Sequence, residues 1–531
     1  MSTTLLRSGH VYSTQDPFAT SMLVVDGMIA WLGDDDGASV YGADADTVID
    51  LRGALVTPAF VDAHVHLTSL GLTLTGCDLA SATTLGHCLD LLESASRECA
   101  GVLLGHGWDE TAWPEGRPPT VAEIDARVGD LPVYLTRVDV HSALASSALR
   151  ARVAHARGLD GWSGSGPLAR AAHHAVRDVA LASVTTEQRQ RAQRAALTRA
   201  SESGVASVHE NGGPTISSPD DLLGALALGR RADMPEVVGY WGALNGHEEA
   251  RELGARGAAG DLCVDGSIGS HTACLCTPYA DDPSTSGALY LTTDDIAEHI
   301  VGATTRGLQA GFHVIGDGAA RAVAVGLHSA AEAVGVESIR KGRLRLEHVE
   351  MLDSTLVGLL CDLGVVASVQ PAFDAAWGGP SGMYARRLGQ MRAQAMNPFA
   401  RMQADGVVLA FGSDAPVTPI DPWGAVRAAA AHTHSAHSLT VRAAFAAHTR
   451  GGRRAARDEA SDPGVLLVGA PATYAVWSPG PLVVHAPDGR LAAWSTDPRS
   501  GVPPLPDLTE AAPVCWQTVR NGRAIFDSGD L

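Results

Sequence analysis

Several features that would assign a protein to a class are missing from this chain. Lysine is almost absent, because Lys341 is the only one and arginine supplies the rest of the 39 basic residues. No apolar run reaches the roughly 18 residues that a membrane-spanning helix needs. The first ten residues contain no apolar stretch typical of a signal peptide. The formal net charge is −20, and the sequence has no basic stripe. We therefore expect neither nucleic acid nor a membrane as a partner.

Cysteine is sparse and scattered. Eight cysteines are spread over 531 residues, a pattern typical of reduced thiols rather than of a disulfide framework. We therefore expect a cytoplasmic protein. Cys274 and Cys276 stand close together but lack partners nearby, and we interpret them as buried or loop residues rather than metal ligands.

Both ends of the chain are rich in short apolar segments of the kind that form strands. Near the N-terminus these segments are separated by Asp-Gly and Gly-Asp turns, at 23–25, 28–32 and 47–50. The C-terminal end has similar segments at 474–477, 482–485, 514–516 and 518–526, the last containing the hairpin signal Asn521-Gly522. We predict one small β-domain built from residues 1–57 and 456–531.

The middle of the chain alternates apolar strands with helical segments. Strands are expected at 133–135, 205–209, 311–314, 344–346, 365–369 and 407–411, and helices at 182–203, 293–308, 318–334, 354–363 and 424–432. Such an alternation implies a parallel sheet, and eight units of it imply a closed (β/α)₈ barrel, here over 58–455. Residues 68–200 form a long insertion after the first barrel strand, and we expect them to cap the site.

The segment Val61-Asp-Ala-His-Val-His-Leu67 is the most informative stretch. Side chains alternate faces along a strand, so His64 and His66 point the same way while their neighbours on the other face are apolar. Two imidazoles held rigidly at the end of a buried strand are half of a metal site.

Further polar residues stand where other apolar strands end. His313, His348 and Asp414 each follow such a strand, and in a (β/α)₈ barrel the carboxyl ends of the strands meet at the catalytic face. Histidine and carboxylate suit Zn²⁺, with Fe²⁺ and Mn²⁺ compatible with the same donors. A metal with an open position lowers the pKa of water to about 7, and a carboxylate can then move the proton. Asp414 is the expected proton shuttle.

The chain resembles the metal-dependent amidohydrolase superfamily and, within it, amidohydrolase family 3, the branch that includes N-substituted formamide deformylases and YtcJ-like proteins. The matching segments follow the family's order along the whole chain: 57–67, 105–109, 137–142, 204–209, 265–272, 313–317, 345–348 and 412–419. The resemblance implies a distorted (β/α)₈ barrel with a small β-sandwich made from both termini. It also implies a small-molecule substrate, and a homodimer is common in the superfamily.

The resemblance also implies residue roles. His64 and His66 would bind the more buried metal with Asp414, while His313 and His348 would bind a second ion or, in a one-metal site, bind the metal or hold the substrate. His141 matches a family histidine that contacts substrate. Asp265, in the Asp-Gly-Ser loop, is expected near the substrate or behind the residues that touch it.

Two positions depart from the family pattern. Many two-metal members bridge their ions with a carboxylated lysine four residues before the Asp-Gly of the Asp265 loop, where this chain has Asp261. Three interpretations remain: one metal ion, Asp261 as a shorter bridge between two ions, or an inactive site. Because aspartate is shorter than a carboxylated lysine, we expect one ion. His271 replaces an arginine of the family, either as a changed substrate contact or as a loop residue without a role.

Aromatic residues on expected loops suggest an apolar pocket. Trp108, Trp113, Phe373 and Trp377 are candidates for its wall, with Trp108 and Trp377 foremost, and they favour an apolar or aromatic group on the substrate. The histidines at 431–437 lie outside the matched segments, and we interpret them, with His106, His173 and His174, as packing or surface residues.

The expected function is metal-dependent hydrolysis of a non-peptide C–N bond, in an amide or an N-acyl or N-formyl amine. A heterocycle deaminase is the alternative enzyme, for which Glu210 or Glu347 would supply the acid and base. A barrel that binds a ligand without catalysis is the alternative of a different class.

Overall fold

The computed structural model describes residues 2–99, 101–484 and 501–531. Its centre is an eight-stranded parallel sheet whose strands follow one another in chain order. They are β7 (Phe60–Val65), β13 (Val205–Gly212), β14 (Glu236–Trp241), β15 (Gly257–Ala258), β16 (Gln309–Val314), β17 (Arg345–His348), β18 (Val366–Val369) and β19 (Val408–Phe411). A bridge between Val65 and Ala415 joins the two end strands, so the sheet nearly closes. The structure is a distorted (β/α)₈ barrel, as predicted.

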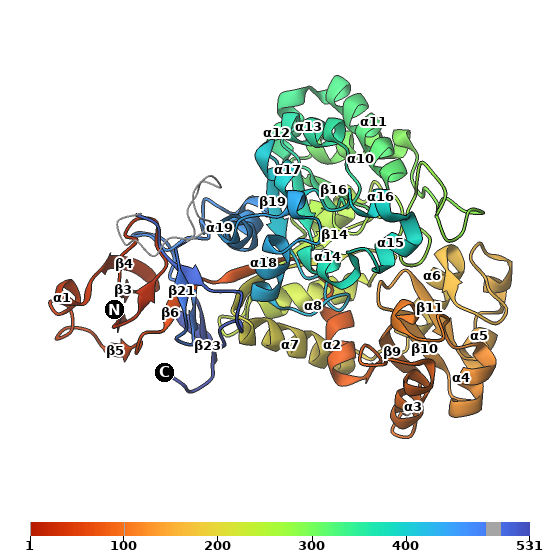
Figure 1. Cartoon of the computed structure of the whole chain (residues 1–531), viewed down its shortest axis with the longest axis horizontal. Helices are drawn as coiled ribbons and strands as arrows, with labels where there is room; N and C mark the ends of the chain where they lie inside the picture. The colour runs from red at the N-terminus through yellow and green to blue at the C-terminus, as the bar shows by residue number, and fades with distance from the viewer. Residues whose placement is uncertain (1, 100, 485–500) are drawn as a thin grey trace.

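Helices cover the outside of this barrel (Figure 1). Those expected at 293–308, 318–334 and 354–363 are observed as α10 (Thr293–Thr305), α11 (Asp317–Val334) and α13 (Ser354–Asp362). The helix expected at 424–432 is α18 (Pro422–Ala430), which begins earlier because Asp421 caps it and Pro422 takes its first position. The barrel interior and these helices share one large apolar core.

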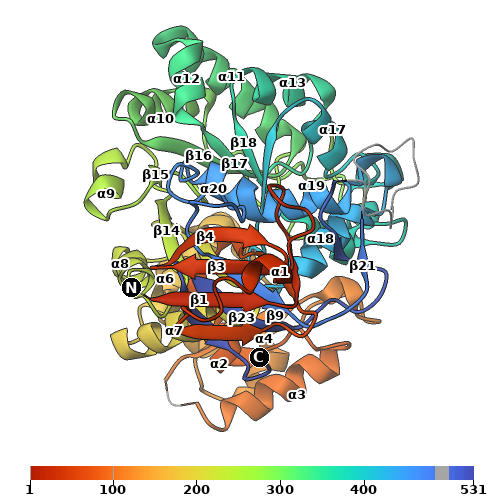
Figure 2. The same cartoon turned by 90° about the vertical axis from the view of Figure 1, so that its left-hand side faces the viewer.

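The two chain ends meet in a β-sandwich beside the barrel (Figures 1 and 2). One sheet has the order β4-β3-β1-β5 and the other the order β2-β6-β20-β23-β24. Their bounds are β1 (Thr3–Arg7), β2 (His10–Val11), β3 (Ser21–Val25), β4 (Met28–Gly33), β5 (Thr47–Asp50), β6 (Leu55–Pro58), β20 (Tyr474–Trp477), β23 (Cys515–Arg520) and β24 (Arg523–Asp527). Asn521 and Gly522 form the expected hairpin turn between β23 and β24. Of the strand expected at 482–485, β21 (Leu482–Val483) is observed, and His485 lies outside the described residues.

A separate unit is inserted after the first barrel strand. It has its own five-stranded sheet, formed by β8 (Cys77–Asp78), β9 (Leu103–Trp108), β10 (Val133–Arg137), β11 (Ser142–Ala145) and β12 (Leu168–Ala169). Helices α3 (Leu85–Ser96), α4 (Val121–Val128), α5 (Ser147–Ala151) and α6 (Arg170–Leu181) belong to the same unit. Figure 1 shows it beside the barrel, on the side away from the sandwich.

The insertion unit begins later and ends earlier than 68–200. Helix α2 (Leu67–Thr75) packs so tightly on α7 (Thr186–Glu202) that a Cβ on Gly71 would lie 1.9 Å from the carbonyl oxygen of Ala192. Both helices therefore belong to the wall of the barrel. None of the described helices is long and apolar enough to cross a membrane.

Candidate metal centre

Four histidines and two aspartates converge at the carboxyl end of the barrel. His64 lies in β7 and His66 directly follows it, while His313 and His348 lie near the ends of β16 and β17. Asp414 follows β19, and its backbone N–H donates to the carbonyl oxygen of His64 at 2.7 Å. All of these side chains are buried. The structure therefore brings together all five residues expected at the ends of barrel strands.

Asp261 lies at the centre of this group. Its Oδ2 is 3.4 Å from Nε2 of His64 and 3.1 Å from Nε2 of His66. Its Oδ1 is 3.5 Å from Nδ1 of His313 and 3.7 Å from Nε2 of His348. One carboxylate thus presents one oxygen to each histidine pair, which is the arrangement of a bridging ligand.

The expectation that an aspartate would fall short of both pairs is therefore wrong. Strand β15 is only two residues long, and the chain turns at Gly260, with φ of 90°. The following residues cross the mouth of the barrel along β16, where His313 N–H donates to Leu262 O and Val264 N–H donates to His313 O. The backbone of Asp261 thus comes inward, so its short side chain reaches both pairs.

Each histidine of the group except His66 is oriented by a second contact. Nδ1 of His64 lies 2.9 Å from Glu347 Oε2, and Nδ1 of His348 lies 2.8 Å from Gln370 Oε1. Nε2 of His313 lies 3.3 Å from the carbonyl oxygen of Gly266. Because these acceptors take the N–H of each ring, the other ring nitrogen presents its lone pair to the centre.

A buried ion pair stands behind His64. Glu347 accepts hydrogen bonds from Arg345 and contacts His64, and both Arg345 and Glu347 are fully buried. Burial opposes ionisation of Glu347, but the Arg345 guanidinium and His64 hold its pKa well below the usual value of a glutamate. Glu347 is therefore a fixed negative charge that holds an imidazole, and it is not free to exchange protons with a substrate.

Two residues of the centre adopt an uncommon backbone conformation. His348 has φ of 70° and Asp414 has φ of 55°, in the left-handed region that residues other than glycine rarely adopt. Such strain persists where the surrounding structure fixes it, and it is concentrated at functional sites. Here it turns the two side chains into the barrel mouth at the end of their strands.

The donor set fits a divalent cation. Asp261 Oδ1, Asp414 Oδ1 and His64 Nε2 are buried without a hydrogen-bond partner, although a buried polar atom normally has one. Two sets of donor atoms lie close enough to share an ion: His64, His66 and Asp414, and His64, Asp261 and His348. Bonds of about 2.1 Å at tetrahedral angles place donor atoms about 3.4 Å apart, close to the separations around Asp261.

The electrostatics of the centre also favour a cation. Burial lowers the pKa of His66, yet Asp261 and Asp414 raise it to about 10, which shows how strongly this centre attracts positive charge.

A pocket opens from the centre. We call it the reaction pocket, and His141, His313, His348 and Asp414 lie on its wall with the apolar side chains of Ile268, Ile315, Phe373, Trp377, Met383 and Val417. Trp377 is thus on the pocket wall as expected, and so is His141, whose ring lies 5.0 Å from that of His313. Burial and the neighbouring His313 lower the pKa of His141 to about 3, so this imidazole is neutral.

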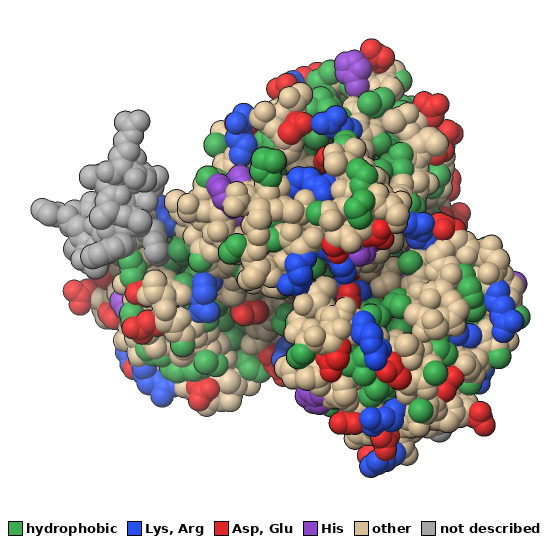
Figure 3. All heavy atoms as spheres, turned by 45° about the vertical axis from the view of Figure 1, so that its right-hand side comes forward, with side chains coloured by type: hydrophobic (Ala, Val, Ile, Leu, Met, Phe, Trp, Pro, Cys, Tyr) green, Lys and Arg blue, Asp and Glu red, His purple; other side chains and the backbone are tan. Residues whose placement is uncertain are grey.

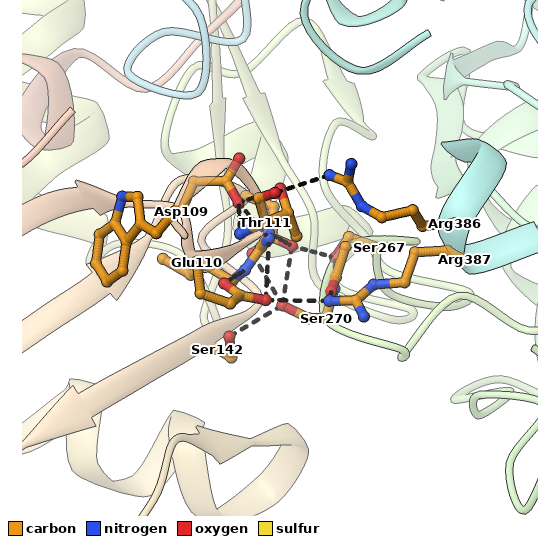
Figure 4. A network of polar contacts seen from close by, with 12 residues as sticks. Asp109, Glu110, Thr111, Ser142, Ser267, Ser270, Arg386 and Arg387 are labelled. Atoms are coloured by element: carbon orange, nitrogen blue, oxygen red, sulfur yellow. Dashed lines mark hydrogen bonds and ion pairs between the residues drawn. The ribbon is translucent and has the colours of Figure 1, made fainter. Parts of the chain in front are cut away.

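A polar network fixes the loop that carries His141 (Figure 4). Arg137 donates to Asp139 at 2.7 Å, to Asp109 at 2.8 Å and to Glu110 at 2.9 Å. Asp139 Oδ1 in turn accepts the backbone N–H of His141 at 3.3 Å. The buried guanidinium of Arg137 therefore fixes the conformation of the loop by which the insertion unit faces the metal centre.

The same network joins the insertion unit to the barrel. Ser267 and Ser270, from the loop after β15, donate to Asp139 at 2.8 and 2.9 Å. Arg387, from α15 (Met383–Leu388), donates to Glu110 at 3.0 Å. Figure 4 shows these arginine and serine side chains reaching the acidic residues from the barrel side. Residues of both the insertion unit and the barrel therefore enclose the reaction pocket.

Three residues expected at the substrate lie elsewhere. Trp108 is 1% exposed, packs in the core of the insertion unit and donates its indole N–H to Leu135 O. Asp265 is fully buried, and its carboxylate accepts the backbone N–H groups of Cys274, Ile315 and Gly316. His271 lies near the surface and contacts Asp281 at 3.1 Å. Only the expectation for Trp108, which supports the insertion unit, is wrong. Asp265 holds the backbone behind the reaction pocket and His271 is a loop residue, and each place is one of the two alternatives left open for it.

The other histidines stay apart from the centre, as expected. His106 contacts Thr136 and the carbonyl oxygen of Pro416, and His173 contacts the Tyr134 hydroxyl. In the segment 431–437, His432 lies 3.6 Å from Asp374 and His437 contacts the carbonyl oxygen of Gln394. These contacts hold the histidines in positions away from the metal centre.

Several residues that shape the centre were missed from the sequence. Gln370 acts on His348 through a hydrogen bond between the ends of different strands, and nothing local marks it. Arg137 and Asp139 lie in the matched segment 137–142, but the sequence did not show that they hold the loop of His141. The alternation Arg345-Leu-Glu347 was a usable signal, because it places two opposite charges on one face of a buried strand.

Comparison with known proteins agrees with this geometry. The sequence profile of the amidohydrolase family matches residues 47–526. The chain belongs to this family. It is similar to YtcJ of Bacillus subtilis, with 25% identity over 413 residues, which cover 73% of this chain and 75% of YtcJ. Over a shorter stretch of 135 residues, 24% of this chain and 25% of the other, it is 29% identical to the N-substituted formamide deformylase of Arthrobacter pascens.

A solved structure supports the same assignment. An uncharacterised metal-dependent hydrolase from Pyrococcus horikoshii has 26% identity and a TM-score of 0.71, covering 90% of this chain and 97% of its own. Together with the family match and the buried His and Asp groups, this makes the amidohydrolase a metal-dependent hydrolase.

Proposed function

We propose that this amidohydrolase cleaves a non-peptide C–N bond in an amide or an N-acyl or N-formyl amine with the help of two divalent metal ions, of which Zn²⁺ is the first candidate. Asp261 would be a ligand of both ions. His64, His66 and Asp414 would hold one ion, and His313 and His348 the other. The observation that carries the proposal is the position of the Asp261 carboxylate, whose two oxygens face the two histidine pairs. The similarity to a formamide deformylase over part of the chain supports the choice of bond.

Divalent ions at this centre would supply the positive charge that lowers the pKa of water and polarises a carbonyl group. The residues of the chain would position the substrate and transfer the proton. The neutral His141 can donate an N–H to the carbonyl oxygen of the substrate from the pocket wall. Asp414 accepts the proton of the attacking water and passes it to the departing nitrogen as the C–N bond breaks. Phe373 and Trp377 bind the apolar part of the substrate and exclude water.

For the deaminase alternative, neither glutamate proposed from the sequence is free at the reaction pocket. Glu347 is bound to Arg345 and His64. Glu350 does lie on the pocket wall, where it accepts a hydrogen bond from the Tyr384 hydroxyl. Glu210 accepts the backbone N–H of Leu67 at 2.7 Å and is not on the reaction pocket wall. Neither candidate acid is therefore placed to reach a heterocyclic ring there.

Replacing Asp414 by Asn tests the proton transfer. The amide keeps the size of the side chain but cannot accept the proton, so kcat for an N-formyl amine should fall by about 10²- to 10⁴-fold. Steady-state kinetics on the metal-loaded protein, with Asp421→Asn as a control at a helix cap, measure this. Undiminished turnover in Asp414→Asn would exclude the proposed role. No turnover by the unmodified protein with any divalent metal, with unimpaired ligand binding in Asp414→Asn, would support the non-catalytic alternative.

A further inference from the structure

A second pocket lies against the metal centre, between the insertion unit and the barrel. We call it the side pocket, and it is a cavity of about 80 Å³ that opens to solvent. His66 stands at one end of its wall, and Val140, next to His141 of the reaction pocket, lies on the same wall. The surface is hollowed where the insertion unit meets the barrel (Figure 3).

The wall of the side pocket is mainly apolar. Its apolar side chains come from both units: Leu72, Leu104, Val140, Leu181, Ile216 and Pro416. Among the described residues that line it there is no aspartate and no glutamate, and Arg177 is its one arginine. Arg177 therefore faces a mainly apolar space.

Arg177 has no partner within the described part of the chain. It lies in α6, is 8% exposed, and makes no ion pair or hydrogen bond there, and its Nη2 is buried without a partner. The neighbouring Asp178 is exposed and forms no ion pair with it. Burial and the charge of Arg177 lower the pKa of His174 to about 4, so this neighbour is neutral.

An unpaired guanidinium in such a place is costly. Burying a charge without a partner disfavours folding, because the charge loses its hydration. Two other buried arginines have carboxylate partners, since Arg137 contacts three carboxylates and Arg345 contacts Glu347. A third, Arg150, donates to the backbone carbonyl oxygens of Ala145, Ser163 and Gly166. Arg177 differs because the partner it lacks would have to come from outside the chain.

We propose that Arg177 binds the carboxylate of the substrate, so that this amidohydrolase acts on N-acyl or N-formyl amines that carry an acid group on an apolar arm. The inference rests on the proposed function. The guanidinium fork suits a carboxylate in two-point contact, and the apolar wall suits the arm that leads to it. One molecule would extend from the metal centre past His66 into the side pocket.

Binding of a non-hydrolysable probe tests this without turnover. The dissociation constants of 3-phenylpropionate and of the neutral 3-phenylpropanol are measured by calorimetry on the metal-loaded protein, on Arg177→Gln and on Arg191→Gln. Arg191 is an exposed arginine of α7 and serves as the matched control for loss of charge. We expect 3-phenylpropionate to bind about 10- to 100-fold more weakly to Arg177→Gln, with the alcohol unchanged and Arg191→Gln like the unmodified protein.

Other outcomes would overturn the inference. Equal affinity of 3-phenylpropionate for Arg177→Gln and the unmodified protein would mean that the metal centre alone holds the acid. Inorganic phosphate binding at the same site as tightly as the probe would mean a simple anion site. If the expected loss is seen but no N-acyl amine is hydrolysed, the side pocket is right and the proposed reaction is wrong, so the two failures are distinguishable.

A stability measurement keeps the inference testable if Arg177→Gln misfolds. Because Arg177 has no partner among the residues that the structure describes, Arg177→Met should not lower the melting temperature. Arg345→Met should lower it, because Glu347 is then left buried and unpaired. A drop in Arg177→Met as large as in Arg345→Met would show that Arg177 is paired within the fold, against the proposal.

Discussion

At the scale of single residues, the centre depends on side chains that touch no substrate. Glu347, Gln370 and the carbonyl oxygen of Gly266 each fix one imidazole, so the ring nitrogen that faces Asp261 is set before any ion binds. Hydrogen bonds of this kind hold a metal site in the geometry that the ion needs.

Replacing Gln370 by Leu tests this arrangement. The change removes the acceptor for His348 Nδ1 without leaving a buried charge, so we expect metal affinity to fall by about 10- to 100-fold. Competition with a chelator measures the affinity, and Gln403→Leu on an exposed helix face is the control. An unchanged affinity would mean that His348 needs no orientation by Gln370.

At the scale of elements, the strand ends were predictable and the position of Asp261 was not. Apolar runs ending in His or Asp predicted the places of His64, His313, His348 and Asp414, because parallel strands end at one face of a barrel. The reach of Asp261 depends on the backbone instead. A Cβ on Gly242 would lie 2.7 Å from the nitrogen of Leu262, so this glycine lets the segment approach β14 closely. No local pattern shows such an approach between segments that are distant in sequence.

Helix α15 contacts the insertion unit, and a mutation can test whether this contact shapes the reaction pocket. Arg387 contacts Glu110 and Asp281 and donates to Gly269 O. Arg387→Gln should therefore weaken the contact between the insertion unit and the barrel beside the reaction pocket. We expect KM to rise severalfold with little change in kcat, because the residues at the metal centre are untouched. Steady-state kinetics check this against Arg401→Gln, which removes only an exposed helix pair. A fall in kcat with unchanged KM would contradict the assigned role.

At the scale of the whole molecule, the sandwich and the barrel are joined through aromatic side chains. Trp477 of β20 packs edge-on against Phe60 and Trp423 of the barrel and donates its indole N–H to Thr57 Oγ1. The repeated strand signals at both chain ends predicted one β-domain, but this junction follows from packing between residues far apart in the chain. The junction fixes the start of the first barrel strand, β7, which leads to His64 and His66.

Replacing Trp477 by Ala should therefore destabilise the whole chain. Loss of a large buried aromatic side chain costs about 3–5 kcal/mol of the free energy of unfolding, and urea denaturation measures it. Trp516→Ala, on a half-buried tryptophan of the sandwich, should cost clearly less. Equal effects would mean that the junction adds no stability of its own.

Metal content per chain tests the central claim most directly, namely that Asp261 joins the two histidine pairs. Elemental analysis is done on protein purified without chelators and on Asp261→Ala purified in the same way. The account predicts about two divalent ions per chain in the unmodified protein and one or fewer in Asp261→Ala. One ion in the unmodified protein, or two in both, would contradict it.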